Sequence, residues 1–253
     1  MCFNEKKQEY YKEASIIWSN CKKEIKNFTG EGELIWCKKL GRYLNHLLTN
    51  ESICYCKVTP KIKLYRTQRG NLINEGIERM LPINETAVDG RCNVGGIAYT
   101  YTSQDRDTSI LEIKPNNGEI VTVAEIELKR THKFLGIELY KIIMEQCRGF
   151  ERIFGPVTSN LIEIISKEYS TKITKEEDYK PLQVITSVFK ELRSDNDGVF
   201  FLSSMTEKYN FVLYKNGNSS DIYKDIEIVN RTVYCVEKIE GNHIKVKEII
   251  KKT

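Results

Sequence analysis

Histidine and proline are scarce in this chain, and neither sign of charge prevails. Only three of the 253 residues are histidines, and they lie far apart in different local contexts, so no histidine-based catalytic site is suggested. Five prolines exclude a proline-rich linker protein. The 39 basic residues outnumber the 35 acidic ones by only four, an imbalance too small to indicate nucleic acid as a partner.

Long apolar runs and several well-known enzyme motifs are also missing. No stretch approaches the roughly twenty uncharged apolar residues that span a bilayer, so we expect no membrane partner. The chain contains no Gly-x-x-x-x-Gly-Lys-Ser/Thr, Gly-x-Gly-x-x-Gly, His-Glu-x-x-His or Gly-x-Ser-x-Gly motif. The enzyme classes that depend on those motifs are therefore excluded. Hydrophobic residues nevertheless make up 40% of the chain, which is enough to build a folded core.

Eight cysteines are scattered through the chain, and no amino-terminal apolar run resembles a secretory signal. A reduced, cytoplasmic setting fits this pattern best. Cys54 and Cys56 are separated by one residue, which is a poor match to a zinc knuckle, although Cys21 and Cys37 could complete four thiolates. We therefore expect buried free thiols and no metal site.

The first sixty residues carry the period of amphipathic helices. Apolar residues recur at intervals of three and four over residues 4–26 and again over 34–48, which predicts a helical hairpin. Pro60 marks a boundary, and short β-rich pieces follow it. The sequence therefore predicts a helical extension over residues 1–59 and a main domain over residues 60–253.

The main domain mixes strands and helices without strict alternation. We expect strands at residues 61–65, 96–102 and 120–128, and helices at 133–150, at 161–168 and from Pro181 onward. Further strands are expected at residues 198–202, 210–214, 226–240 and 243–250, with a turn at residues 240–242 joining the last two. This order favours an α+β fold with a mixed or antiparallel sheet.

Residues 89–103 are more polar than an ordinary strand or turn. Glycines such as Gly95 and Gly96 let a backbone approach a ligand closely, and Arg91 offers a fork of donors to phosphate oxygens, so the segment suggests a polyphosphate ligand. Tyr99 and Tyr101 fall on one face of the expected strand, because side chains alternate along it, and either ring could stack on a flat heterocycle.

A short helix is expected directly after this segment. Asp105 is a good helix cap, and Glu112 lies two turns further on, between Leu111 and Ile113. A carboxylate with apolar neighbours becomes partly buried and then needs a partner.

At these residues the sequence resembles the RES-domain family, which is named for the Arg, Glu and Ser of its motifs. The similarity runs in order through Leu-Tyr-Arg at 64–66, Gly-Arg-Cys-Asn at 90–93, the glycines at 95–96, Tyr-Thr-Tyr-Thr-Ser at 99–103, Thr-Ser-Ile-Leu-Glu at 108–112, Tyr-Lys-Pro-Leu-Gln-Val-Ile at 179–185, residues 197–204 and residues 210–214. Each motif alone is weak, but the ordered set spans about three fifths of the chain.

The resemblance implies an ADP-ribosyltransferase-like fold and an NAD-degrading toxin that a partner antitoxin restrains. NAD would be the substrate, with water or inorganic phosphate as the second reactant, and neither a metal nor nucleic acid would be needed. Two other functions stay open on the same scaffold. One is transfer of ADP-ribose to a protein, and the other is a non-catalytic nucleotide-binding module, which the departures Cys92 and Leu202 from the family pattern suggest.

The family's functional residues carry over to matching positions of this chain. Glu112 would stabilise the positive charge that develops on the ribose, and Arg66 and Arg91 would bind the pyrophosphate and its neighbouring ribose. Tyr99 or Tyr101 would stack against nicotinamide. These roles come from the resemblance.

The serine of the family motif carries over less clearly. Ser203 would hydrogen-bond the ribose or the incoming phosphate or water. Leu202 stands where the family usually has proline, which leaves the choice between Ser203 and Ser204 open.

Overall fold

The computed structural model describes residues 3–27, 55–83, 86–136, 155–192, 195–214 and 222–252. Within these ranges, nine strands form one sheet in the order β1-β5-β6-β7-β3-β2-β4-β8-β9, and only β5 and β6 run parallel to each other. The strands are β1 (Tyr55–Val58), β2 (Leu64–Arg69), β3 (Thr100–Ser103), β4 (Ile120–Leu128), β5 (His132–Gly136), β6 (Gly198–Leu202), β7 (Tyr209–Leu213), β8 (Ile226–Glu240) and β9 (His243–Lys252).

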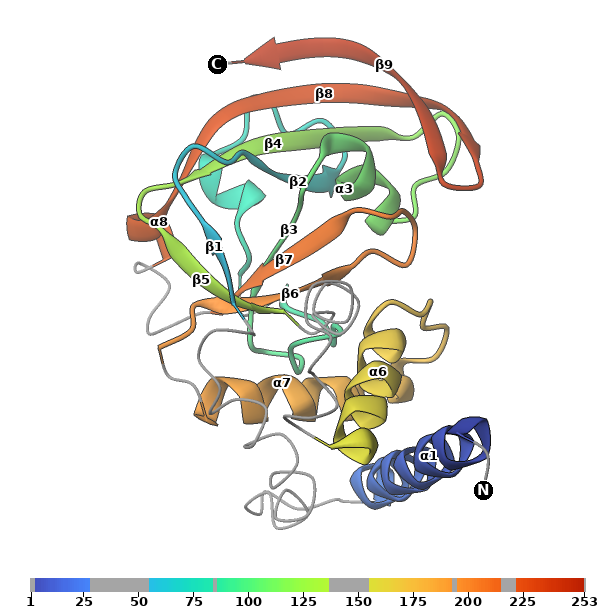
Figure 1. Cartoon of the computed structure of the whole chain (residues 1–253). Helices are drawn as coiled ribbons and strands as arrows, with labels where there is room; N and C mark the ends of the chain where they lie inside the picture. Colours follow the sequence, from blue (N-terminus) through green and yellow to red (C-terminus); the bar gives the residue numbers. More distant parts are fainter. Residues whose placement is uncertain are drawn as a thin grey trace.

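The helices fall into two groups around this sheet. Figure 1 shows α1, α6 and α7 together at one end of the molecule, with the β8–β9 hairpin at the opposite end and α3 lying against the middle strands. The helices are α1 (Phe3–Asn27), α3 (Arg106–Glu112), α6 (Pro156–Tyr169), α7 (Lys180–Leu192) and α8 (Ile222–Asp225), with short 3-10 helices η1 (Ile77–Met80) and η3 (Glu176–Asp178).

Three apolar clusters build the core. The first joins α1, α6 and α7 to the strands β5, β6 and β7, and it includes the buried Trp18 and Tyr169. The second lies among strands on both sides of β2, and the third lies beneath α3. Because α1 contributes Ala14, Trp18 and Cys21 to the first cluster, the amino-terminal helix shares its core with the main domain.

Most of the expected elements are confirmed. The α+β fold with a mostly antiparallel sheet is present, and the strands at 120–128, 198–202 and 226–240 have the expected bounds. The helix over 4–26 is confirmed as α1, and Pro181 lies in the first turn of α7. In these segments the local sequence pattern and the tertiary burial agree.

Other expectations need correction. The strand expected at 61–65 begins only at Leu64, and the strand expected at 96–102 begins only at Thr100, because Gly96 has a positive φ of 83° and the chain before β3 is irregular. Residues 132–136, where a helix was expected to begin, form β5 between β1 and β6. The strand β1 was not expected at all.

Part of the predicted helical hairpin lies outside the described residues, as do Cys37, Cys54 and the rest of the helix expected at 133–150. Of the thiols considered for zinc, neither Cys21, which is buried in the first core cluster, nor Cys56, which lies on β1, forms a disulfide within the described residues. None of the helices in the described ranges is long and apolar enough to cross a membrane.

Candidate functional site

The strands β2 and β3 diverge, and this divergence opens the candidate site. They are in register only at Tyr65 and Ser103, while β2 stays paired with β4 from Leu64 to Arg69. Two cavities lie beside the divergence. The first has a volume of about 220 Å³ and is called the Glu112 cavity; the second has about 450 Å³ and is called the arginine cavity. Both are lined by Arg66, Gly90, Tyr101 and Ile113, so they share a wall.

Arg66, on β2, crosses the gap between the diverging strands. Its Nε donates to the carbonyl of Met80 (2.7 Å) and its Nη1 donates to the carbonyl of Tyr101 (3.1 Å). No carboxylate is among these partners, and burial lowers the pKa of the guanidinium to about 10, so the group stays charged at neutral pH. Arg66 therefore presents an uncompensated positive charge to both cavities.

Glu112 is the last residue of α3, and local sequence explains how it gets there. The carboxylate of Asp105 caps the helix by accepting from the backbone N–H of Thr108 (2.9 Å). Buried Ile110 and Leu111 then pack the helix against the sheet. Because residues three apart share a helix face, Ser109 and Glu112 both line the Glu112 cavity.

The half-buried carboxylate of Glu112 has the partners that its apolar neighbours demand. Its Oε1 accepts from the hydroxyl of Ser203 (2.5 Å) and from the side-chain amide of Asn210 (2.6 Å). Asn210 is fixed in turn, because its Oδ1 accepts from the hydroxyl of Ser103 (2.6 Å). Strands β3 and β7 and the loop after β6 thus fix one oxygen of the carboxylate at the wall of the cavity.

The two serines of the sequence motif have different surroundings. The Ser203 hydroxyl donates to Glu112 and accepts from the backbone N–H groups of Met205 (3.0 Å) and Thr206 (3.3 Å). Ser203 is only 5% exposed and lies behind Glu112, whereas Ser204 lines the Glu112 cavity. Of the two serines, only Ser204 is among the residues that line the Glu112 cavity.

The loop at residues 89–93 is held by a buried glutamine of α7. Nε2 of Gln183 donates to the carbonyls of Gly90 (3.0 Å) and Asn93 (2.8 Å) and lies 3.1 Å from Oδ1 of Asp89. Only glycine fits at position 90, since an added Cβ would lie 2.8 Å from the Tyr101 hydroxyl. This loop forms the shared part of the two cavity walls.

Arg91 projects from that loop into the Glu112 cavity. Its Nη2 donates to the carbonyl of Thr171 (3.1 Å), and its guanidinium lies over the ring of Phe201 at 5.4 Å. Its Nη1 is buried and has no hydrogen-bond partner among the described residues. The rest of the side chain is partly exposed at the cavity wall, and its positive charge favours an anionic ligand there.

The two candidate aromatic residues occupy different positions. The Tyr101 hydroxyl accepts from the N–H of Cys92 (2.9 Å) and donates to Oδ1 of Asn93 (2.8 Å), and its ring lines both cavities. Tyr99 lines the arginine cavity only and packs against Tyr214 at 5.2 Å. Burial raises the pKa of Tyr99 to about 12 and that of Tyr101 well above 10, so both phenols are neutral.

The charges that line the two cavities are mostly positive. Six basic side chains face two acidic ones, which is a formal surplus of four: Arg66, Arg69, Arg79, Arg91, Lys114 and Lys172 against Asp89 and Glu112. This surplus equals the formal net charge of the whole chain. Such a concentration favours a ligand with several negative charges.

The structure thus brings Arg66, Arg91, Glu112, Tyr101 and Ser204 to one cavity, with Ser203 behind it and Tyr99 in the adjoining one. Gly95 and Gly96, which were singled out as ligand-approaching glycines, line neither cavity. Asn210 and Gln183 were given no role from sequence. The sequence does contain a signal for both residues, because each is an amide within a segment that is otherwise apolar. The structure buries both amides, and a buried amide needs hydrogen-bond partners.

No group of three or more His, Cys, Asp or Glu side chains in the described ranges is placed to bind a metal ion. The model of one protein family, described as the RES domain, matches residues 63–230, which include every residue that lines the two cavities. A comparison with curated proteins finds no match.

Proposed function

This chain belongs to the RES-domain family, and on that premise we propose that it degrades NAD by cleaving the bond between nicotinamide and ribose. The observation that carries the proposal is the position of Glu112. Its carboxylate lies at the wall of a cavity that Arg66 and Arg91 also line, and two hydrogen bonds fix one of its oxygens. A carboxylate and two guanidinium groups on one cavity can supply negative charge beside the sugar and positive charge beside the phosphates of a dinucleotide.

The chemistry follows from the charge that develops during bond cleavage. The C–N bond breaks, and its electron pair leaves with nicotinamide, which departs as a neutral molecule. The ribose carbon becomes oxocarbenium-like, and a negative charge beside it lowers the barrier. An oxygen of water or of inorganic phosphate then forms the new bond to that carbon. Water gives ADP-ribose and a proton, and phosphate gives ADP-ribose 1-phosphate.

The basic residues supply binding and orientation. A guanidinium binds phosphate oxygens with two parallel donors, which fixes geometry as well as charge. Arg91 has a buried Nη1 without a described partner, and Arg66 has only carbonyl partners. We assign the pyrophosphate of NAD to these two side chains. Lys114 and Lys172 line the same cavity and would attract a second anion, such as inorganic phosphate.

The two serines have different roles in this proposal because they lie at different positions. Ser203 orients the carboxylate of Glu112, and Ser204 contacts the ribose or the incoming acceptor. The ring of Tyr101 forms the wall beside nicotinamide, because its hydroxyl is already engaged with Cys92 and Asn93. No group in this set has to act as a nucleophile.

The biological consequence would be growth arrest by loss of NAD. An enzyme of this kind depletes the NAD of its own host unless another protein blocks it, so the antitoxin that the family resemblance implies stays part of the proposal. Transfer of ADP-ribose to a protein would use the same cavity with a different acceptor. Labelled NAD distinguishes the two, because protein transfer leaves label on a polypeptide and NAD degradation does not.

The test is nicotinamide release by the purified full-length chain, with and without inorganic phosphate. Glu112→Gln keeps an oxygen that accepts from Ser203 and Asn210 but removes the charge, so we expect the rate to fall by about a thousandfold. Glu191→Gln, an exposed change on α7, is the control and should leave the rate unchanged. Failure of the folded wild-type protein to release nicotinamide would remove the proposal.

A further inference from the structure

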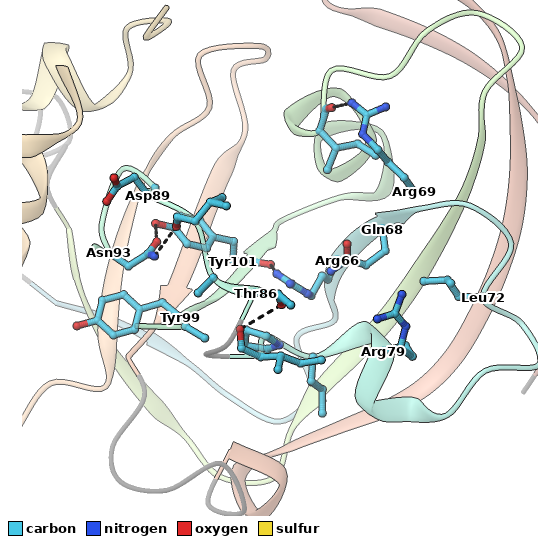
Figure 2. A pocket seen from close by; sticks show the side chains of 18 residues that line it. Arg66, Gln68, Arg69, Leu72, Arg79, Thr86, Asp89, Asn93, Tyr99 and Tyr101 are labelled. Atoms are coloured by element: carbon cyan, nitrogen blue, oxygen red, sulfur yellow. Dashed lines mark hydrogen bonds between the residues drawn. The ribbon is translucent and has the colours of Figure 1, made fainter. Parts of the chain in front are cut away.

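Arg79 is a cation without a described partner at the rim of the arginine cavity. It is exposed on η1, directly before Met80, whose carbonyl binds Arg66. None of the described residues forms a side-chain hydrogen bond or an ion pair with it. Figure 2 shows Arg79 rising from η1 toward the side of the cavity where Gln68 and Leu72 lie, opposite Tyr99 and Asn93.

The neighbouring arginine is already engaged. Arg69 forms an ion pair with Glu119, and its Nη2 donates to the carbonyls of Ile113 and Lys114 (2.5 and 3.1 Å). Figure 2 shows its guanidinium turned away from Arg66 and Arg79. Arg69 therefore fixes the chain that follows Glu112. Of the three arginines that line this cavity, Arg79 is the one whose side chain has no hydrogen-bond or ion-pair partner among the described residues.

Placing the reacting bond at Glu112 decides where the rest of a dinucleotide lies. Glu112 lines only the smaller cavity, so the nicotinamide ribose belongs there, and the pyrophosphate passes the shared wall at Arg66. The larger cavity then receives the adenosine half. Its apolar lining, which includes Leu81, Pro82 and Val88, suits a purine.

Arg79 has no role in binding the pyrophosphate in this arrangement, because Arg66 and Arg91 already serve it. It lines the larger cavity, so an adenosine ribose bound there can lie beside it. An arginine beside that ribose is the usual way for a protein to accept a 2′-phosphate.

We propose that the arginine cavity binds adenosine phosphorylated on its ribose, and that the substrate is therefore NADP in preference to NAD. The inference rests on the proposed function for the orientation of the dinucleotide. It adds the class of dinucleotide and assigns Arg79 as the residue that determines this specificity.

The first test needs no catalysis. Calorimetry on the full-length protein would compare adenosine 2′,5′-bisphosphate with adenosine 3′,5′-bisphosphate, which has the same charge, and with 5′-AMP. We expect the 2′,5′ isomer to bind about tenfold more tightly than either of the others, because only its 2′-phosphate meets Arg79. Arg79→Gln should remove most of that advantage. Lys61→Gln, an exposed change that lines neither cavity, should preserve it.

The second test measures nicotinamide release from NADP and from NAD. The ratio of the two kcat/KM values should favour NADP and should fall about tenfold in Arg79→Gln. Equal affinity for the two bisphosphates, or a preference that Arg79→Gln leaves intact, would overturn the inference while NAD cleavage still stands. Absence of nicotinamide release from both dinucleotides would instead remove the proposed function, and the calorimetry would still decide whether Arg79 selects a 2′-phosphate.

Discussion

The two cavities share a wall and differ in how their polar groups are arranged. In the Glu112 cavity the carboxylate already has two donors, and the serine behind it has two backbone N–H groups. The arginine cavity is about twice as large and has at its rim a guanidinium without a described partner. The carboxylate of the Glu112 cavity is therefore fixed before a ligand arrives, as the proposed chemistry requires, whereas the arginine cavity presents an exposed side chain that can still adjust to a ligand.

The largest effect that would test this difference is expected at Ser203. Ser203→Ala removes a donor from Glu112, so the carboxylate is no longer fixed, and we expect kcat for nicotinamide release to fall about a hundredfold. Ser204→Ala is the matched change one residue away, and it should act mainly on KM. Steady-state kinetics on both variants would measure the split. A larger loss of kcat in Ser204→Ala than in Ser203→Ala would contradict the role of Ser203 in orienting the carboxylate.

An intermediate effect is expected at the wall that the cavities share. Gln183→Ala leaves the carbonyls of Gly90 and Asn93 with fewer donors, so the free energy of unfolding should fall by about 1–3 kcal/mol. Ligand binding should weaken in both cavities at once, because the loop at residues 89–93 lines both. Denaturant unfolding and calorimetry would measure the two effects, with Glu191→Ala on the same helix as the control. If Gln183→Ala weakened ligand binding in one cavity only, the loop at residues 89–93 would not support both cavities.

The smallest effect concerns Cys92, which lies inside the same loop. Burial raises the pKa of its thiol to about 12, so at pH 8 only about one molecule in ten thousand carries the reactive thiolate. We expect almost no alkylation of Cys92 by iodoacetamide in the folded protein and full alkylation after denaturation, measured by mass spectrometry of the peptides.

The same shift has a consequence for stability. The pKa of the Cys92 thiol in the folded protein lies above that of an unfolded thiol, which is about 8.5. The stabilisation that the neutral thiol contributes to the folded protein is therefore complete below about pH 8.5 and is lost as the pH rises toward 12. Rapid alkylation of Cys92 at pH 8 would show that the loop opens, and the shared wall would then be less rigid than the contacts of Gln183 indicate.

The secondary-structure elements that the sequence predicted are those whose pattern lies within a single segment. The apolar period over residues 4–26, the β-rich segment at 120–128 and the capping residue Asp105 each predicted their element, because the signal for it lies within a few residues. The prediction failed at β5, where residues 132–136 lie between β1 and β6. There, pairing with strands distant in sequence overrides a helical pattern.

The candidate site shows the same division. The sequence by itself identified Arg66, Arg91, Glu112 and the two serines as candidate site residues, because it contains both the chemistry of each residue and the order of the motifs. Only the tertiary structure decided that Ser203 lies behind the carboxylate and Ser204 beside the cavity, that Asn210 and Gln183 hold the parts together, and that Arg79 is left without a described partner. The reason is physical: hydrogen bonds and burial depend on distances in space, and these side chains come from strands and helices up to about a hundred residues apart.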